Sequence, residues 1–481
     1  MNISNLEPEI LWRQFDAILK KPRPSGKEGA LRDYITGCAK SKGFEARQDK
    51  AGNVVILVPA SPGYEKSDTT VLQGHLDMVC EKNSDVLHDF DNDPISPEIK
   101  GEYLYARGTT LGADNGIGVA AALAMMDESS PHGRLELLFT VDEETGLAGA
   151  STLDRELLTG RRLINLDSEE DGAIYVGCAG GGDEVTHLKA TRTPFPQGTA
   201  PYKLAISGLM GGHSGLNIGE NRANAIKLLA RTLKRFLSAG LSFEISEVVG
   251  GNKRNAIPRE AYALLHMKEA GAADSIVKES LKDYAAEFGT IEKTIKVELQ
   301  HFNAAEVKNT GVIKEKELLI DLILAIPSGV LAMSRDIPGL VETSSNLGVL
   351  ATKGDEIILN SNSRSSVAPA LAQTREQVKA IGALAGARIE SSGGYPGWQP
   401  DMSSPLLKKA REIYAGNFGK EALVKAVHAG LECGLIGEKF PGMDMISIGP
   451  EIHGAHSPDE RVHIPSVGRF YEFLKKLLAA L

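Results

Sequence analysis

The chain has 481 residues, and its 63 acidic and 53 basic side chains give a formal net charge of −10. This balance argues against a general nucleic-acid binder, whose affinity would depend on clustered Lys and Arg. Apolar residues make up 42% and charged residues 24% of the chain, a composition that excludes disordered and fibrous proteins. At roughly 150 residues per domain, the length predicts about three domains, with two or four also allowed.

The two segments that could direct the chain to a membrane both carry polar interruptions. Residues 1–20 hold acidic side chains within their apolar pattern, unlike a signal peptide. The most apolar stretch, residues 318–333, contains Asp321 and Pro327 and is too short and polar to span a bilayer. We therefore expect a cytoplasmic protein with no membrane partner, whose cysteines are reduced thiols.

The first third of the chain alternates helix and strand signals. Ser25 and Glu28 have the spacing of a capping box and predict a helix that runs to about Gly43. A helix of small residues is predicted over 114–128. Short apolar runs predict buried strands at residues 54–59, 69–73, 135–141 and 163–166. This alternation favours a mostly parallel sheet.

The middle of the chain has a different pattern, bounded by glycines at 180–182 and 393–394. It contains long helical patterns between strand-like stretches, which favours an α+β arrangement. The predicted helices cover residues 221–239, 272–288 and 368–386.

After residue 392 the α/β alternation resumes. Helices are predicted at 404–418 and 467–481, and strands at 422–427 and 443–448. The predicted fold is therefore a discontinuous α/β domain with a mostly parallel sheet, residues 1–183 and 392–481. An α+β domain, residues 184–391, is inserted into it.

Polar motifs follow three of the predicted strands, at the edge where open α/β sheets bind ligands. In the sequence GHLD, His75 and Asp77 share one face of a strand, so Asp77 could orient a metal-binding His75. Residues 142–144 are three adjacent carboxylates, whose mutual repulsion would be relieved by a cation. Asp167 ends another buried strand. Each motif alone also fits a solvated strand end or an exposed acidic loop.

Further candidate ligands are Asp114, which opens the small-residue helix, and the nearby pair His453 and His456. Histidine and carboxylate ligands without thiolate suit zinc, manganese or cobalt. Three carboxylates nearly balance the charge of two divalent cations. This favours a two-metal site, with the metals roughly 3.5–4 Å apart and sharing a water nucleophile.

Other enzyme motifs receive less support. Gly116, Gly118 and Ala121 spell G-x-G-x-x-A, with Glu136 in the position of an acidic ribose ligand. That fingerprint must follow a strand directly, whereas residues 107–113 form a polar, glycine-containing segment. The sequence also contains neither a phosphate-binding G-x-x-x-x-G-K-[ST] motif nor a G-x-S-x-G nucleophile elbow.

The ordered motifs carry a family resemblance. Four of them resemble the dinuclear zinc aminoacylase and carboxypeptidase superfamily: residues 74–77, 112–116, 142–146 and 165–168. Six more resemble the bacterial aminoacyl-histidine dipeptidase family within it: residues 175–181, 211–215, 254–260, 395–400, 428–434 and 456–460. The resemblance covers essentially the whole chain, in order.

The resemblance implies a role for each matching residue. His75 and Asp167 would hold one metal, Glu144 and His456 the other, and Asp114 would bridge both. The peptide bond after Asp114 is typically cis in such proteins. The remaining roles fall to Glu143 as general base, Asp77 as the residue that orients His75, His213 as the oxyanion donor, and Arg364 as the clamp for the substrate carboxylate.

Three of these assignments have alternatives in the sequence. His453 departs from the family pattern and competes with His456, which is preferred because Ser-Pro-Asp-Glu follows it. Arg364 could also be a surface arginine after a hairpin, and His213 a turn histidine between glycines.

The resemblance as a whole implies a cytoplasmic metallodipeptidase that cleaves dipeptides, Xaa-His among them, with two divalent ions. Zinc is the first choice, with cobalt or manganese as alternatives. The inserted domain would act as a lid and form a homodimer, with His213 acting across it. The alternatives are an aminoacylase or carboxypeptidase with the same metals, and a non-catalytic member that binds only peptide or metal.

Overall fold

The computed structural model describes residues 3–307 and 311–481, and it divides the chain into two compact units. The first unit comprises Met1–Gly177, Pro400–Ala426 and Leu431–Leu481. The second comprises Cys178–Gln399 and Val427–Gly430. The division predicted from the sequence, after residues 183 and 391, did not assign residues 427–430 to the second unit.

The short apolar runs of the first unit form an eight-stranded sheet. Its central strands β6, β3, β7 and β23 pair in parallel, while β1 and β2 continue the sheet in antiparallel orientation. In spatial order the strands are β1 Glu45–Gln48, β2 Val54–Val58, β6 Leu135–Thr140, β3 Thr70–His75, β7 Arg162–Asn165, β23 Asp444–Ser447, β8 Ala173–Cys178 and β22 Leu423–Val427. The prediction of a mostly parallel sheet is confirmed.

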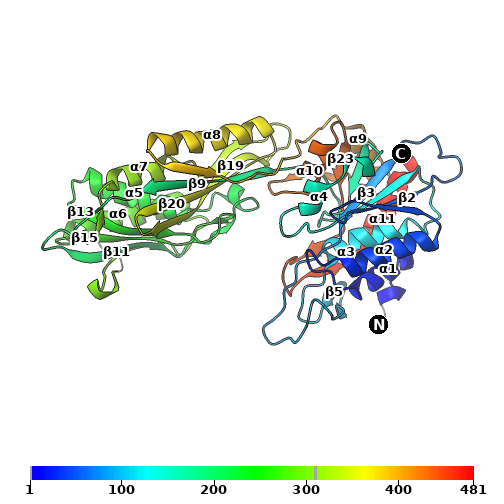
Figure 1. Cartoon of the computed structure of the whole chain (residues 1–481), viewed down its shortest axis with the longest axis horizontal. Coiled ribbons are helices and arrows are strands. Elements are labelled where there is room, and N and C mark those ends of the chain that lie inside the picture. Colours follow the sequence, from blue (N-terminus) through cyan, green and yellow to red (C-terminus); the bar gives the residue numbers. More distant parts are fainter. Residues whose placement is uncertain (1–2, 308–310) are drawn as a thin grey trace. The chain divides into compact units, whose positions relative to one another are not determined.

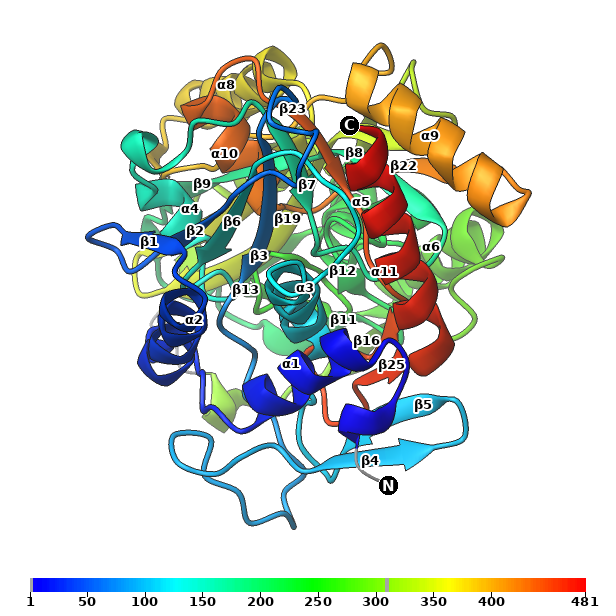
Figure 2. The ribbon, with the colours of Figure 1, turned by 90° about the vertical axis from the view of Figure 1, so that its right-hand side faces the viewer.

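Helices cover this sheet, and a small antiparallel sheet adjoins it. In Figure 2 the helix α3 lies beside β3, and α1 lies beside α3, as their contacts also show. The helices are α1 Glu9–Leu19, α2 Gly29–Ser41, α3 Ala113–Ala124, α4 Ala148–Thr152, α9 Pro405–Phe418, α10 Glu432–Lys439 and α11 Ile464–Ala480. The small sheet has the order β24 Ile452–His453, β25 Arg461–His463, β5 Tyr103–Ala106 and β4 Pro97–Lys100.

The start of α2 differs from the sequence prediction. Instead of closing a capping box, the Ser25 hydroxyl donates to Asp77 Oδ2 at 2.7 Å. Glu28 Oε1 accepts the backbone N–H groups of Gly26, at 2.7 Å, and Asp142, at 3.0 Å. The predicted helix is confirmed, but the capping box is wrong. Its two side chains instead bind residues at the ends of β3 and β6.

The second unit is built on a nine-stranded antiparallel sheet. Its long hairpin, β19–β20, turns at residues 353–355. In spatial order the strands are β16 Lys296–His301, β11 Ala200–Ser207, β15 Ala261–Met267, β13 Phe243–Gly250, β19 Val341–Lys353, β20 Glu356–Ser365, β9 Gly180–Lys189 and β21 Arg388–Ser391, with β18 Gly329–Met333 paired to β19.

Four helices pack with this sheet (Figure 1): α5 Ala225–Ser238, α6 Gly271–Phe288, α7 Lys316–Ala325 and α8 Ala368–Leu384. Asn224 caps α5 by accepting the N–H groups of Ile226 and Lys227. The apolar stripe of α5, including Leu229 and Phe236, lies in the core of the unit. Two short strand pairs complete the unit: β12 Gly212–His213 with β14 Ala256–Ile257, and β10 Arg192–Thr193 with β17 Val312–Ile313. The predicted α+β insertion is confirmed.

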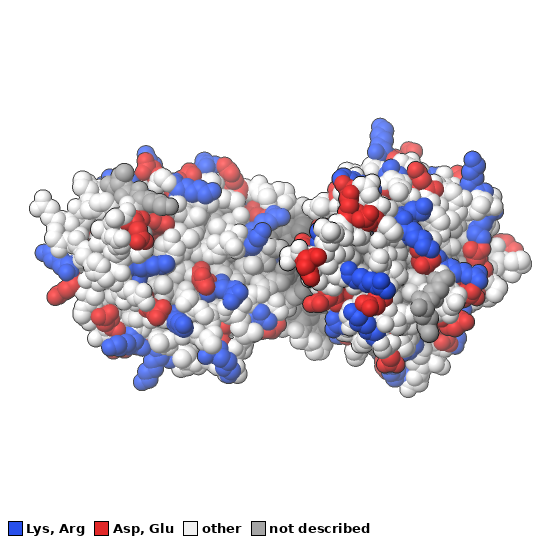
Figure 3. Space-filling view, turned by 90° about the horizontal axis from the view of Figure 1, so that it is seen from below, with Lys and Arg blue, Asp and Glu red and all other residues white. Residues whose placement is uncertain are grey.

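The face of the molecule in Figure 3 carries charged side chains of both signs. Among the described residues on that face, basic and acidic side chains are interspersed. No helix in the described part of the chain is long and apolar enough to cross a membrane.

Candidate metal centre

The parallel strands of the first unit place three polar motifs at one edge of the sheet. His75 is the last residue of β3 and lies in register with Thr140, the last residue of β6. Gln73 of β3 is likewise in register with Asn165, the last residue of β7. The residues that follow β6 and β7 therefore emerge beside His75. This register accounts for the meeting of motifs that are about 25 to 90 residues apart in the chain.

One group of possible ligands surrounds His75, which is 1% exposed. Its Nε2 atom lies 3.1 Å from Asp114 Oδ1 and 3.2 Å from Asp167 Oδ1. The ligand atoms of these three residues all lie within 4.8 Å of one another, a spacing that could hold a metal ion. A second candidate group around the same ring includes Glu143 and Glu144.

The other carboxylate oxygen of Asp114 belongs to an adjoining group. His456 Nε2 lies 3.1 Å from Asp114 Oδ2 and 3.1 Å from Glu144 Oε2, and these three residues also satisfy the 4.8 Å criterion. Asp114 thus presents one oxygen to each group, as a bridging ligand would. The peptide bond after Asp114 is cis, in agreement with the family resemblance.

Asp77 contacts the Nδ1 side of His75 and also bonds to the loop of Glu143 and Glu144 that follows β6. Its Oδ1 atom is 3.4 Å from His75 Nδ1, and its carboxylate accepts the N–H groups of Glu143, at 3.0 Å, and Glu144, at 3.1 Å. Burial opposes ionisation of Asp77, but hydrogen bonding and the charge of His75 lower its pKa below the usual range. An ionised Asp77 can orient both the imidazole ring and the loop of the neighbouring carboxylates.

The protonation of the cluster reflects its crowded charges. Burial raises the pKa of Asp167 to about 6. Hydrogen bonds to Asp114 and Glu144 raise the pKa of His456 to about 11. Without a cation, protons therefore neutralise part of the cluster. A metal would replace those protons, because its histidine ligands bind as neutral imidazoles and its carboxylates as anions.

Glu143 is distinct from its neighbour Glu144. Burial, reinforced by the charges of Asp167, Glu432 and Glu144, raises the pKa of Glu143 well above 4.5. Divalent cations nearby would lower it again. A carboxyl pKa raised above its ordinary value is the property that a general acid–base group requires.

The residue set fits two cations. Within residues 3–307 and 311–481, the buried Oε1 atom of Glu144 has no hydrogen-bond partner. A buried carboxylate oxygen without a donor is energetically costly, and a metal would satisfy it. The set contains two histidines and no thiolate, as expected for zinc, cobalt or manganese.

His213 belongs to the second unit, on β12. Its Nδ1 atom accepts the backbone N–H groups of Gly215, at 3.2 Å, and Leu216, at 3.1 Å. These two bonds leave the ring proton on Nε2. Burial, aided by the positive charge of Arg364, lowers the pKa of His213 to about 4. At neutral pH the ring is therefore an uncharged N–H donor, as a residue that stabilises an oxyanion needs to be.

Arg364 lies in the same unit, on β20, and only 6% of it is exposed. Its Nη1 atom donates to the Tyr395 hydroxyl at 2.9 Å. Among the described residues, its buried Nε has no hydrogen-bond acceptor. The alternative of a surface arginine is therefore wrong.

Several buried residues near these side chains were not assigned roles from the sequence. They are Arg23, His428, Glu432 and Glu460, of which the last three lie within motifs that carried the resemblance. Glu432 accepts hydrogen bonds from Gln73 and Thr140, both at 2.6 Å. The partners of these four residues come from distant parts of the chain. For the three that lie within motifs, membership of the motif was the only available signal, and Arg23 had none.

The two C-terminal histidines have different partners, which leads to a prediction. His453 Nε2 lies 3.2 Å from Glu451 Oε1, whereas His456 faces Asp114 and Glu144. We expect His456→Ala to lower the metal content by about one ion per chain. His453→Ala, the matched control, should leave it unchanged. Metal analysis of the two purified variants distinguishes them, and the opposite pattern would assign the ligand to His453.

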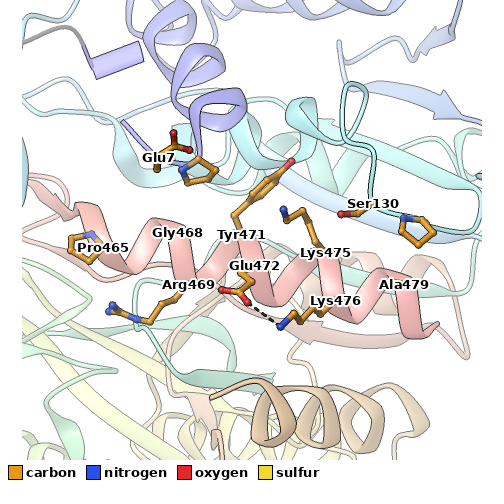
Figure 4. A pocket seen from close by; sticks show the side chains of 12 residues that line it. Glu7, Ser130, Pro465, Gly468, Arg469, Tyr471, Glu472, Lys475, Lys476 and Ala479 are labelled. Carbon is orange, nitrogen blue, oxygen red and sulfur yellow. Dashed lines mark ion pairs between the residues drawn. The ribbon is translucent and has the colours of Figure 1, made fainter. Parts of the chain in front are cut away.

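A pocket of about 780 Å³ lies elsewhere in the first unit, along α11 (Figure 4). Its charged side chains are partly neutralised by ion pairs, such as Lys476 with Glu472 at 3.0 Å and Arg469 with Asp171 at 2.6 Å. None of the candidate site residues lines it. The pocket is therefore separate from the candidate ligands at the carboxyl edge of the sheet.

Comparisons with known proteins show which family the chain resembles over its whole length. The cytosol non-specific dipeptidase of Escherichia coli (strain K12) is 44% identical over 486 aligned residues, which cover 99% of this chain and 98% of the relative. The aminoacylhistidine dipeptidase of Vibrio alginolyticus has a crystal structure that matches with a TM-score of 0.93 and 41% identity, covering 100% of this chain and 98% of the other. These findings confirm the resemblance drawn from the motifs.

More distant structures share the fold. The aminopeptidase PepT of Bacillus cereus matches with a TM-score of 0.55 at 16% identity, over 99% of both chains. The model of Peptidase family M20/M25/M40 matches residues 71–480 of this chain. The chain is therefore a member of peptidase family M20/M25/M40.

Proposed function

We propose that the chain is a cytoplasmic metallodipeptidase with two divalent ions, zinc in the first place and cobalt or manganese as alternatives. The observation that carries this proposal is the pair of ligand groups that share Asp114, one completed by His75 and Asp167 and the other by Glu144 and His456. The names of the two relatives, a cytosol non-specific dipeptidase and an aminoacylhistidine dipeptidase, support the location and the substrate class.

The proposed mechanism is hydrolysis of the peptide bond by water. When bound, the two cations would polarise the scissile carbonyl and lower the pKa of the attacking water. Glu143 takes a proton from that water and passes it to the leaving amine, so that no proton is gained or lost overall. His213 donates its Nε2 proton in a hydrogen bond where negative charge develops on the carbonyl oxygen. Asp77 holds His75 and the Glu143 loop in place.

The first unit supplies the ligands and the base, so we assign it as the catalytic domain. The second unit carries His213 and Arg364, and we assign it as a lid that also forms a homodimer. An aminoacylase or carboxypeptidase would use the same ligands on another acyl group, and comparing dipeptides with N-acyl amino acids separates these alternatives. A protein that only binds peptide or metal would not need Glu143, whose carboxyl group is absent from the two metal groups that share Asp114.

The substrate prediction concerns Arg364. Paired hydrogen bonds from its guanidinium group to the terminal carboxylate would favour dipeptides over their amides. At ~1.5–3 kcal/mol for a hydrogen bond to a charged group, amidation should lower kcat/KM by about 10-fold or more. Arg364→Ala should lower activity on the free acid and remove most of this preference. A lid that closes on two residues should also make a tripeptide a poor substrate.

The measurement is kcat/KM for alanyl-histidine, its amide and a tripeptide. Arg388→Ala is a suitable control, because this arginine of the same unit has a side chain that is 56% exposed. An unchanged acid-to-amide ratio in Arg364→Ala would remove Arg364 from the site. Equal rates on dipeptide and tripeptide would contradict the length limit.

The dimer prediction concerns His213 acting across the interface. Chains with His213→Ala and chains with Glu143→Ala should each be nearly inactive alone. If His213 acts in the partner's site, a hybrid dimer has one site with both defects and one with neither. Statistical mixing makes about half of the dimers hybrid, so about a quarter of wild-type activity should return. A monomeric protein, or no recovery after verified subunit exchange, would contradict the trans role.

A further inference from the structure

Glu460 is a buried carboxylate that lies outside both ligand groups but is bonded to the segment that bears Asp114. It is 2% exposed and follows His456 by four residues. Its Oε2 atom accepts the backbone N–H groups of Leu111, at 2.7 Å, and Gly112, at 2.9 Å. Its Oε1 atom accepts those of Ala113, at 2.7 Å, and Asp114, at 3.2 Å. One side chain thus binds four consecutive amides that end at the proposed bridging ligand.

Among the described residues at the start of the helix, no capping side chain accepts a hydrogen bond from these four amides. They lie at the start of α3, where the first backbone N–H groups of a helix need acceptors from outside it. The N-cap position is Gly112, which has no side chain and adopts a φ of 68°. Glu460 supplies the missing acceptors from a position 346 residues beyond Asp114. Burial raises the pKa of Glu460, and the hydrogen bonds from the backbone amides oppose that rise, so these bonds favour its ionised form.

Arg23 holds the same segment through its carbonyl groups. This arginine is 2% exposed, and its Nη2 atom donates to the carbonyl oxygen of Gly112. Its Nη1 atom donates to the carbonyl oxygens of Leu76 and Asp77, both at 2.8 Å. A Cβ atom on Gly112 would lie 2.4 Å from Arg23 Nη2, so the packing leaves no room for a side chain. The segment before Asp114 is thereby tied to the residues that follow His75.

We propose that Glu460 is a positioning residue of the metal centre, which fixes the carboxylate of Asp114 relative to His456. Glu460 and His456 lie in one short segment, and the carboxylate of Glu460 binds the backbone of the bridging residue. Asp114 and His456 are therefore held as one rigid pair before any cation binds. This inference rests on the proposed two-metal function, because it concerns the geometry of that site.

A purely stabilising role is the alternative, and the chain offers a matched control for it. Glu136 is also a buried carboxylate, 1% exposed, that binds backbone amides. It accepts the N–H groups of Thr159, at 3.0 Å, and Gly160, at 3.0 Å. Glu136 lies near the start of β6, the end opposite to the candidate ligands. Glu136→Gln and Glu460→Gln thus make the same chemical change far from and next to the candidate ligands. In each case the new NH₂ group faces backbone donors.

The experiment compares both variants with the wild type in three measurements. Thermal unfolding reports stability, and hydrogen–deuterium exchange of the metal-free protein reports the protection of residues 111–114 and 159–160. Competition with a chromogenic chelator, together with the Co²⁺ absorption spectrum, reports the metal site. We expect both variants to unfold at lower temperature. Only Glu460→Gln should lose protection at 111–114, alter the Co²⁺ spectrum and weaken Co²⁺ and Zn²⁺ binding, by about 10- to 100-fold.

Wild-type affinity and a wild-type Co²⁺ spectrum in Glu460→Gln would overturn the inference. An equal loss of affinity in Glu136→Gln would also overturn it, by showing a general effect of stability. If Glu460→Gln does not fold, Glu460→Asp keeps the charge on a shorter side chain, and its Co²⁺ spectrum must still differ from the wild type. The binding of metal by the wild type tests the proposed function itself, so the two failures are distinguishable.

Discussion

Replacing Glu143 by alanine is expected to lower kcat by about 10²- to 10⁴-fold while both metals remain bound. This is the range usual for the loss of a general acid–base group. The two groups of possible metal ligands that share Asp114 do not include Glu143. The backbone N–H group of Glu143, which donates to Asp77, is unaffected by the substitution. The loop should therefore keep its conformation and lose only the proton carrier.

Glu144→Ala is the matched control, because Glu144 is the next residue of the same loop and makes the same kind of backbone bond to Asp77. This variant should lose metal, because Glu144 faces His456 at 3.1 Å. Metal analysis and steady-state kinetics on both variants provide the comparison. If Glu143→Ala loses metal and Glu144→Ala retains it, the two roles are exchanged.

Much of the fold and of the candidate site could be predicted from local patterns. The apolar runs before His75, Glu143 and Asp167 indicated strands, and alternation with helices indicated parallel pairing, which places their carboxyl ends at one edge. Asp114 and His456 could not be placed there by pattern alone. His453 and His456 were equally good candidate ligands by their positions in the sequence, and the family motif selected His456.

The residues that sequence reasoning missed have partners that only the tertiary structure brings close. Glu460 and Arg23 bind backbone groups of residues 76–77 and 111–114, and backbone groups leave no signature in side-chain patterns. Ser25 and Glu28 have the spacing of a capping box, but they form hydrogen bonds with Asp77 after β3 and Asp142 after β6 instead. Local propensity is a weak guide where such long-range bonds are available.

The second unit shows the same limit at the level of domains. Glycines at 180–182 and 393–394 indicated the domain boundaries, whereas the two compact units meet at residues 177–178 and 399–400. The long helices of the insertion were predicted from their helical patterns. The segment Val427–Gly430 returns to the second unit between two segments of the first. Its backbone carbonyls at Val427 and Ala429 accept the N–H group of Ala179, a pairing that no local pattern encodes.

The central claim is that hydrolysis of a dipeptide depends on two cations at the edge of the first unit's sheet. The direct measurement is turnover of alanyl-histidine by protein stripped with a chelator, shown to be metal-free by elemental analysis, and then titrated with zinc, cobalt or manganese. We expect no turnover in the stripped protein, and a recovery that saturates near two ions per chain. Full activity in the demonstrably metal-free protein would contradict the account.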